Sequence, residues 1–140
     1  MKRILFVSAI TLTVVVLASS QSRSDQAKTS QLEGTWEMVS GYGAIRPAQG
    51  RRQIKIFSRG HFVFALYNTE TGKLIWAGGG TYTLNGTSYT EHVDFMSEAI
   101  SAGIAGKDQS FTVTVEGDTL TQKGRLSSGE KLNETWKRVD

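Results

Sequence analysis

The stretch Gly34-Thr35-Trp36 and its counterpart Glu134-Thr135-Trp136-Lys137-Arg138 bound the region of the chain that decides the fold. Between them, short segments rich in Val, Ile, Thr, Phe, Tyr and Trp alternate with turn residues, which is typical of β-strands. The pattern predicts strands over 35–41, 53–58, 61–68, 74–84, 88–97, 110–116, 119–126 and 132–139.

Tight turns join these segments. Asn85-Gly86 is the strongest turn signal, because both central residues of a type I′ hairpin turn need positive φ. Consecutive hairpins form a meander, and a meander of about eight strands removes its exposed edges by closing on itself. We therefore expect an all-β fold, an antiparallel up-and-down β-barrel of roughly 8–10 strands. One short helical turn is expected over 97–106, where Ser97 supplies a cap.

Three consecutive glycines, Gly78-Gly79-Gly80, lie inside one of the predicted strands. Glycines weaken a flat strand, but they permit the sharp coiling that a small barrel needs. The alternative is a phosphate-binding loop. That alternative is weak, because a strand and not a helix N-terminus follows the glycines.

The inner face of the barrel follows from alternation, since successive strand residues point to opposite sides. On an early strand, Ile54 and Ile56 are expected to face inward. On the fifth strand, Phe95 is expected to share the inner face with Val93. The residues predicted to line the lumen and contact a ligand are Trp76, Tyr82, Tyr89, Glu91, Phe111, Gln122, Glu134 and Trp136.

Two carboxylates and one amide fall on this inner face: Glu91, Glu134 and Gln122. A buried carboxylate without a partner is costly, so each needs a partner, water or a ligand. One interpretation is internal pairing with Arg138 or tyrosine hydroxyls, or a contact with ordered water. The other is a hydrated cavity in which these groups bind the polar part of a ligand. An eight-stranded barrel is wide enough either to be filled or to hold one small ligand.

Residue patterns for catalysis are weak. The two histidines, His61 and His92, do not have metal-ligand spacing, and the chain contains no cysteine. No serine lies in a G-x-S-x-G turn. A site built from the histidines with Glu91 or Asp94 stays open, as does a Glu91–Glu134 acid pair for glycoside chemistry. We predict no catalytic residue, no cofactor and no metal.

Residues 1–20 have the composition of a signal peptide. Lys2 and Arg3 precede a mainly apolar run over 4–18, and small residues follow at 18–20. A membrane anchor is the alternative, but a spanning helix needs about 20 apolar residues. We therefore expect export to the periplasm or the medium. The predicted organisation is a signal peptide over 1–20, a flexible leader over 21–32 and a barrel domain over 33–140.

The charge of the chain excludes some partners. The formal net charge is +3, and loss of the signal peptide with Lys2 and Arg3 would reduce it to +1. Such a small charge argues against nucleic acid or an anionic membrane surface as a partner. The expected partner is a small, partly apolar molecule, and the expected state is a monomer or a weak homodimer.

The ordered motifs of this chain resemble a family of small exported bacterial lipocalin-like (calycin) barrel proteins of unknown function. The resemblance implies a calycin-type barrel with no established catalytic residues. It also implies that Trp36 and Arg138 pack together and seal one end of the barrel, with Lys137 taking the place of Arg138 if the register slips. The motifs are Gly34-Thr35-Trp36, Gly60-His61-Phe62, the run 78–84, Tyr89-Thr90-Glu91, Val115-Glu116-Gly117-Asp118 and Glu134-Thr135-Trp136-Lys137-Arg138.

Three functions remain. The preferred one is an exported barrel that binds a small, partly apolar molecule without chemistry. The first rival is a protein-binding module, a hydrolase inhibitor or scaffold, that acts through the loop 41–52 with Arg46, Arg51 and Arg52. The second rival is an enzyme that uses a tyrosine or a lumen carboxylate, Glu91 or Glu134, as acid or base.

Overall fold

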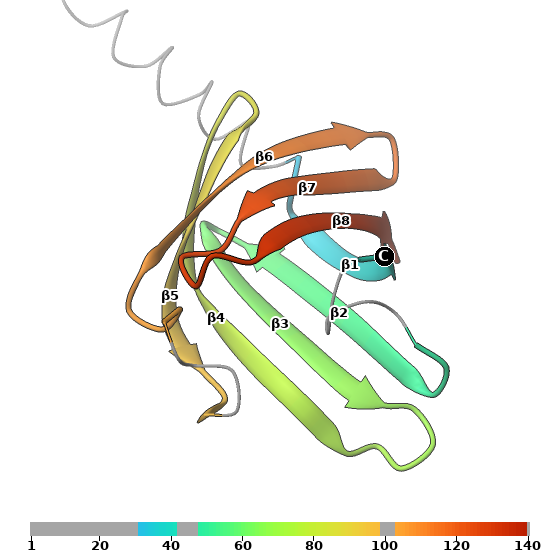
Figure 1. Ribbon diagram of the computed structural model, residues 1–140. Coiled ribbons are helices and arrows are strands. Elements are labelled where there is room, and N and C mark those ends of the chain that lie inside the picture. The colour runs from blue at the N-terminus through green and yellow to red at the C-terminus, as the bar shows by residue number, and fades with distance from the viewer. Residues whose placement is uncertain (1–30, 42–47, 99–102, 140) are drawn as a thin grey trace, which may run out of the picture.

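The computed structural model describes residues 31–41, 48–98 and 103–139 and shows a closed barrel of eight antiparallel strands (Figure 1). Each strand pairs with its neighbour in chain order, and β8 pairs with β1 to close the barrel. The strands are β1 (Gly34–Ser40), β2 (Arg51–Ser58), β3 (His61–Asn68), β4 (Leu74–Asn85), β5 (Ser88–Met96), β6 (Asp108–Glu116), β7 (Thr119–Arg125) and β8 (Lys131–Arg138). The predicted all-β up-and-down barrel is confirmed.

Several predicted segments fall wholly or partly outside the described residues. They are the signal peptide over 1–20, most of the leader over 21–32, residues 42–47 of the predicted contact loop and residues 99–102 of the predicted helical turn. In the described part of the chain, no helix is long and apolar enough to span a membrane.

The hairpin turns differ from the prediction at one position. Asn85 pairs with Ser88, so the central residues of this turn are Gly86 and Thr87. Only Gly86 has positive φ, at 63°, which is the requirement of a type II′ turn and not of type I′. The turn with two positive φ values joins β2 to β3, at Arg59 (49°) and Gly60 (79°).

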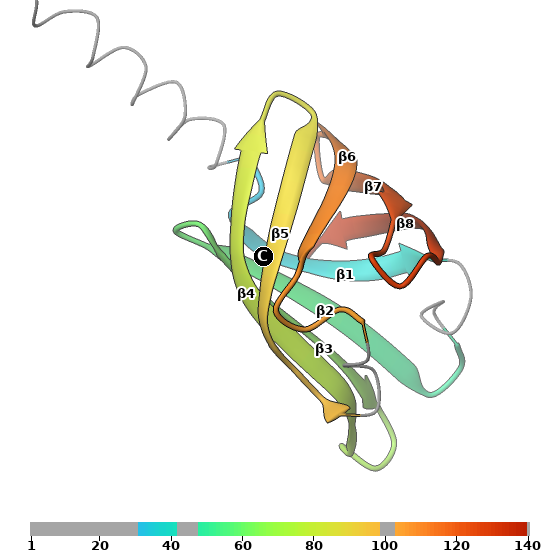
Figure 2. The ribbon, with the colours of Figure 1, turned by 60° about the vertical axis from the view of Figure 1, so that its left-hand side comes forward.

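The glycine run lies inside β4, paired on both sides, so it belongs to the sheet (Figure 2). A bulge falls between Gly79 and Gly80, where β5 contributes one extra residue, Asp94. A Cβ on Gly80 would lie 1.9 Å from the carbonyl oxygen of His92, so only glycine fits at the bulge. The glycines therefore serve the coiling of the barrel.

The bulge overturns the inward assignment of Phe95. Its extra residue shifts the alternation by one position, and the Phe95 side chain is 53% exposed. The ring lies against Gly79 from outside, with Cζ 2.8 Å from the position a Cβ would take. Met96 takes the inner place.

The inward assignment of Ile54 and Ile56 is also wrong. Ile56 is 41% exposed, whereas Gln53, Lys55 and Phe57 are buried and face inward. On the outer face Ile56 pairs with Val63 of β3, which is 44% exposed. The apolar alternation of β2 therefore reflects cross-strand contact on the outer surface, and not a face that packs in the core.

One end of the barrel is closed by Trp36, which has no exposed surface. Its indole N–H donates to the carbonyl oxygen of Leu32 at 2.8 Å. The Arg138 guanidinium carbon lies 4.2 Å from the centroid of the Trp36 ring, and the same guanidinium donates to the carbonyl oxygens of Gln31, at 2.9 Å, and of Glu33. These contacts bring the two tryptophan-bearing ends of the barrel region together at one seal.

Candidate functional site

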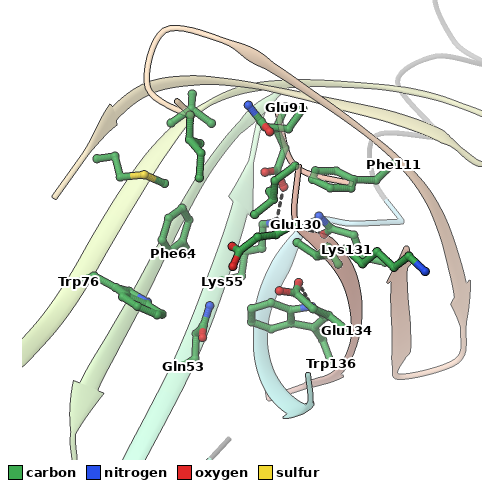
Figure 3. A pocket seen from close by; sticks show the side chains of 17 residues that line it. Gln53, Lys55, Phe64, Trp76, Glu91, Phe111, Glu130, Lys131, Glu134 and Trp136 are labelled. Carbon is green, nitrogen blue, oxygen red and sulfur yellow. Dashed lines mark hydrogen bonds and ion pairs between the residues drawn. The ribbon is translucent and has the colours of Figure 1, made fainter. Parts of the chain in front are cut away.

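A cavity of about 290 Å³ occupies the barrel interior. Side chains from β2 to β8 and from the loops at one end of the barrel enclose it (Figure 3). The lining residues are Gln53, Lys55, Phe64, Trp76, Glu91, Val93, Met96, Ile104, Gln109, Phe111, Gln122, Leu126, Glu130, Lys131, Leu132, Glu134 and Trp136.

The structure brings six of the eight predicted lining residues to this cavity: Trp76, Glu91, Phe111, Gln122, Glu134 and Trp136. Tyr82 and Tyr89 are buried but do not line it. They pack around Phe57, with ring centroids 5.3 and 6.2 Å from its centroid, and fill the adjoining part of the lumen. That a ligand contacts the predicted set stays a prediction.

A buried lysine that sequence reasoning missed lies among these residues. Lys55, on β2, is 3% exposed, and its ammonium group forms an ion pair with Glu91 on β5. The same nitrogen donates to Gln122 Oε1 on β7 at 3.2 Å. It also lies 5.2 to 5.8 Å from four aromatic ring centroids, those of Phe57, Phe62, Tyr89 and Trp136. A desolvated cation is held here by a carboxylate, an amide and ring faces.

Glu91 is the acceptor at the centre of this group. Besides Lys55, the Tyr89 hydroxyl donates to Glu91 Oε1 at 2.7 Å. Burial, followed by the nearby Glu91 charge, raises the pKa of Tyr89 well above its usual value of 10.0, so this phenol stays protonated and donates. Internal pairing, the first of the two interpretations, therefore describes Glu91. Of the partners that this interpretation names, a tyrosine hydroxyl is present, that of Tyr89, but the cation is Lys55 and not Arg138.

Glu134 is in a different situation. It is 4% exposed, and within the described residues its hydrogen bond comes from the Trp136 indole N–H, 3.1 Å from Oε2. Burial raises the pKa of Glu134 to about 7, while Lys55 lowers it and Glu91 raises it further. This carboxyl group therefore titrates near neutral pH, in the wall of the cavity.

Besides Gln122, two buried glutamines line the cavity, and they differ in their hydrogen bonding. Gln109, 1% exposed, is fully engaged with Ser127, which accepts from Nε2 at 2.9 Å and donates its N–H to Oε1 at 2.8 Å. Gln53, 7% exposed, has no partner for Oε1 among the described residues. An orphaned buried acceptor beside a cavity is uncommon in folded proteins.

Aromatic rings form much of the wall, and glycines make room for them. A Cβ on Gly78 would lie 2.7 Å from Phe64 Cζ, and a Cβ on Gly124 would lie 2.7 Å from Phe111 Cδ1. Each ring thus lies directly on the neighbouring backbone. Trp76 and Trp136 lie on either side of Gln53 in Figure 3. The cavity therefore combines aromatic walls with a few polar groups, as ligand pockets commonly do.

Other candidate residues lie away from the cavity. His92 is on the outer surface beside Asp94 and Asp108, and the hydrogen bond to Asp108 raises its pKa. Arg52, from the predicted contact loop, lies in β2 and donates to Glu37 Oε2 at 2.6 Å. Among the described residues, no three His, Asp or Glu side chains form a metal-ligating group.

A sequence signal for Lys55 did exist. Lys55 lies two positions before Phe57, and Gln53 lies four positions before it. Because alternate residues of a strand share a face, an inward Phe57 places both polar residues in the lumen. Ile54 and Ile56 gave the stronger apolar signal, and they misled the assignment. Gln53 and Lys55 are the functional candidates that the sequence analysis missed.

Comparisons with known proteins agree with this architecture. A family model described as a domain of unknown function (DUF4488) matches residues 31–140. A lipocalin-like protein from Bacteroides uniformis superposes with a TM-score of 0.53 at 15% identity, covering 78% of this chain and 99% of that one. An uncharacterised protein from Bacteroides eggerthii gives a TM-score of 0.56 at 12% identity, covering 77% and 99%. No curated protein matches the chain.

Proposed function

The chain belongs to this DUF4488 family, and on that premise we propose that its lipocalin-like barrel binds one small, partly apolar molecule without carrying out chemistry on it. The observation that carries the proposal is the cavity of about 290 Å³, in which aromatic walls surround Gln53, Glu91 and Glu134. Apolar walls with a few oriented polar groups are the usual composition of a small-molecule site.

The proposal includes export to the periplasm or the medium, which rests on the signal-peptide composition of residues 1–20. N-terminal sequencing of the protein from its native host should find a chain that begins near Gln21. A chain that still begins with Met1 would remove this part of the proposal.

Native mass spectrometry of protein purified without denaturation tests the binding itself. We expect a co-purified small molecule that is lost on unfolding. Adding this molecule back to the ligand-free protein should quench tryptophan fluorescence, because Trp76 and Trp136 line the cavity.

A matched pair of variants tests the location. Glu91→Gln should weaken binding, because it removes the partner of Lys55 inside the cavity. Asp94→Asn, on the same strand, should leave binding unchanged, because the Asp94 side chain is 51% exposed on the outer surface. Equal effects of the two substitutions would contradict the cavity as the site and favour the protein-binding alternative.

A further inference from the structure

We infer that the molecule bound in the cavity carries a protonated amine, and that Glu134 and the side-chain carbonyl of Gln53 accept its hydrogen bonds. This inference rests on the proposed binding function and names the chemical class of the ligand. Four features of the cavity support it: its charge balance, the contacts of Glu134, the orphaned acceptor on Gln53 and the aromatic walls.

The charged groups of the cavity do not balance. Lys55 is paired with Glu91, and Lys131 balances Glu130 at the exposed mouth. Among the residues that the structure describes, Glu134 has no cation of its own. In a low-dielectric interior, an uncompensated carboxylate either takes up a proton or binds a cation.

The contacts of Glu134 leave room for a donor. The Trp136 indole donates to Oε2, and no described residue donates to Oε1. The raised pKa of about 7 shows that burial outweighs the attraction of Lys55 at this site. A ligand ammonium would supply the charge that the neighbouring side chains do not.

Gln53 provides independent support. Its side chain is more than nine-tenths buried and lines the same cavity, and no residue in the described part of the chain donates to Oε1. Leaving a buried acceptor without a hydrogen bond destabilises the folded state. An ammonium group has three donors, enough for an acceptor on each of Glu134 and Gln53, which line the same cavity.

The walls suit a cation with an apolar body. Phe64, Trp76, Phe111 and Trp136 present aromatic surface to the cavity. Ring faces attract ammonium groups and also pack against apolar carbon. The Lys55 ammonium is an example of this attraction within the barrel, since it lies near four aromatic rings.

An anionic ligand fits the same groups less well. Among the residues described, Lys55 is the buried cation that could receive an anion, but Lys55 is already bonded to Glu91 and Gln122. A carboxylate would have to displace Glu91 and would add a negative charge beside Glu134. An ammonium instead compensates the negative charge of Glu134, although repulsion from the Lys55 ammonium reduces the gain in binding free energy.

The inference makes amine binding depend on pH. The charged and titratable groups near Glu134 are Lys55 on β2, Glu91 and Tyr89 on β5, and Glu130 and Lys131 at the mouth. Below pH 7, Glu134 holds a proton that an incoming ammonium must displace. Affinity should therefore rise about tenfold between pH 6 and pH 8 and then level off.

Three probes with one apolar body test the ligand class: 2-phenylethylamine, 2-phenylethanol and phenylacetate, titrated calorimetrically into the full barrel. The amine should bind at least about tenfold more tightly than the alcohol at pH 8, with release of a proton at pH 6. Glu134→Gln should abolish both the preference and the pH dependence. Glu116→Gln is the control. It removes an exposed carboxylate at the end of β6 and should leave the amine preference and the pH dependence unchanged.

The outcomes separate the inference from the function that it rests on. Binding of the alcohol or the neutral dye Nile red without an amine preference overturns the inference and leaves the proposed function standing. Tighter binding of phenylacetate also overturns it and makes Lys55 the anchor. If neither the three probes nor the dye binds, both fail. If Glu134→Gln does not fold, the pH dependence of the unmodified protein decides.

Discussion

The guanidinium of Arg138 stacks against Trp36, with 4.2 Å between its central carbon and the ring centroid. The two residues are also paired across the β1–β8 ladder. The contact therefore lies on the seam that closes the barrel, and the same arginine ties down the backbone of Gln31 and Glu33. The burial of the Trp36 ring, its contact with the Arg138 cation and the pairing of β1 with β8 therefore all occur at the same point of the barrel.

Trp36→Ala should lower the free energy of unfolding by about 3–5 kcal/mol, because it empties a fully buried site. Arg138→Ala should cost less, since the arginine is only partly buried and loses mainly packing and a cation–ring contact. Urea unfolding measures both. If Trp36→Ala is as stable as the parent, the seal does not hold the barrel together.

The Lys55–Glu91 pair should behave as a single unit. Lys55→Met alone should cost about 3–5 kcal/mol, because it leaves the buried Glu91 carboxyl group without its cation. The double variant Lys55→Met/Glu91→Leu should recover most of this loss, since buried ion pairs can be replaced by apolar side chains. Arg52→Met, which removes a partly exposed ion pair with Glu37, is the control and should cost less than about 1 kcal/mol. A double variant as unstable as Lys55→Met would contradict the coupling.

Glu134 should make the barrel less stable as the pH rises. Its folded pKa of about 7 lies above the unfolded value of 4.5, so the folded state binds the proton more tightly. Stability should thus fall between pH 4.5 and 7, by on the order of 3 kcal/mol, and level off above pH 7. Glu134→Gln should flatten the profile and raise stability at pH 8.

His92 complicates that measurement. The raised pKa of this exposed histidine also gives stability that is lost as the pH rises. Urea titrations should therefore compare His92→Gln with His92→Gln/Glu134→Gln. A slope that persists in the double variant would assign the pH dependence to other groups.

Arg59 occupies a left-handed position, with φ of 49°, in the β2–β3 turn. Asparagine adopts this conformation more readily than arginine. Arg59→Asn should therefore raise the free energy of unfolding by up to about 1 kcal/mol. The bond that the Arg59 backbone N–H donates to Glu33 at 2.6 Å is kept. Arg59→Ala is the control and should give no gain.

Sequence alone predicted the strands, their order and the closure, because turn residues and strand propensity are local properties. It failed where tertiary structure overrode alternation. The extra residue Asp94 in the bulge turned Phe95 outward. The outer pairing of Ile56 with Val63 made an exposed face read as a core face.

The candidate site was predicted in part for the same reason. Glu134 and Trp136 lie on a strand without a bulge in its pairing with β7, so alternation placed them in the cavity wall. Lys55 was missed because a lysine is rarely fully buried unless it is paired. Its partner, Glu91, lies 36 residues away in the sequence, and no local pattern joins the two.

The pairing of β1 with β8 also determines the order in which this protein can fold. Arg138 reaches the carbonyl of Glu33 across 105 positions of the sequence, and contacts of such separation form slowly. Until the last strand is in place, β1 and β7 remain open edges that can pair with other chains. The native barrel therefore cannot be completed progressively from its N-terminus. Its final cooperative step awaits the C-terminal strand, and a chain shortened by that strand becomes an aggregation hazard.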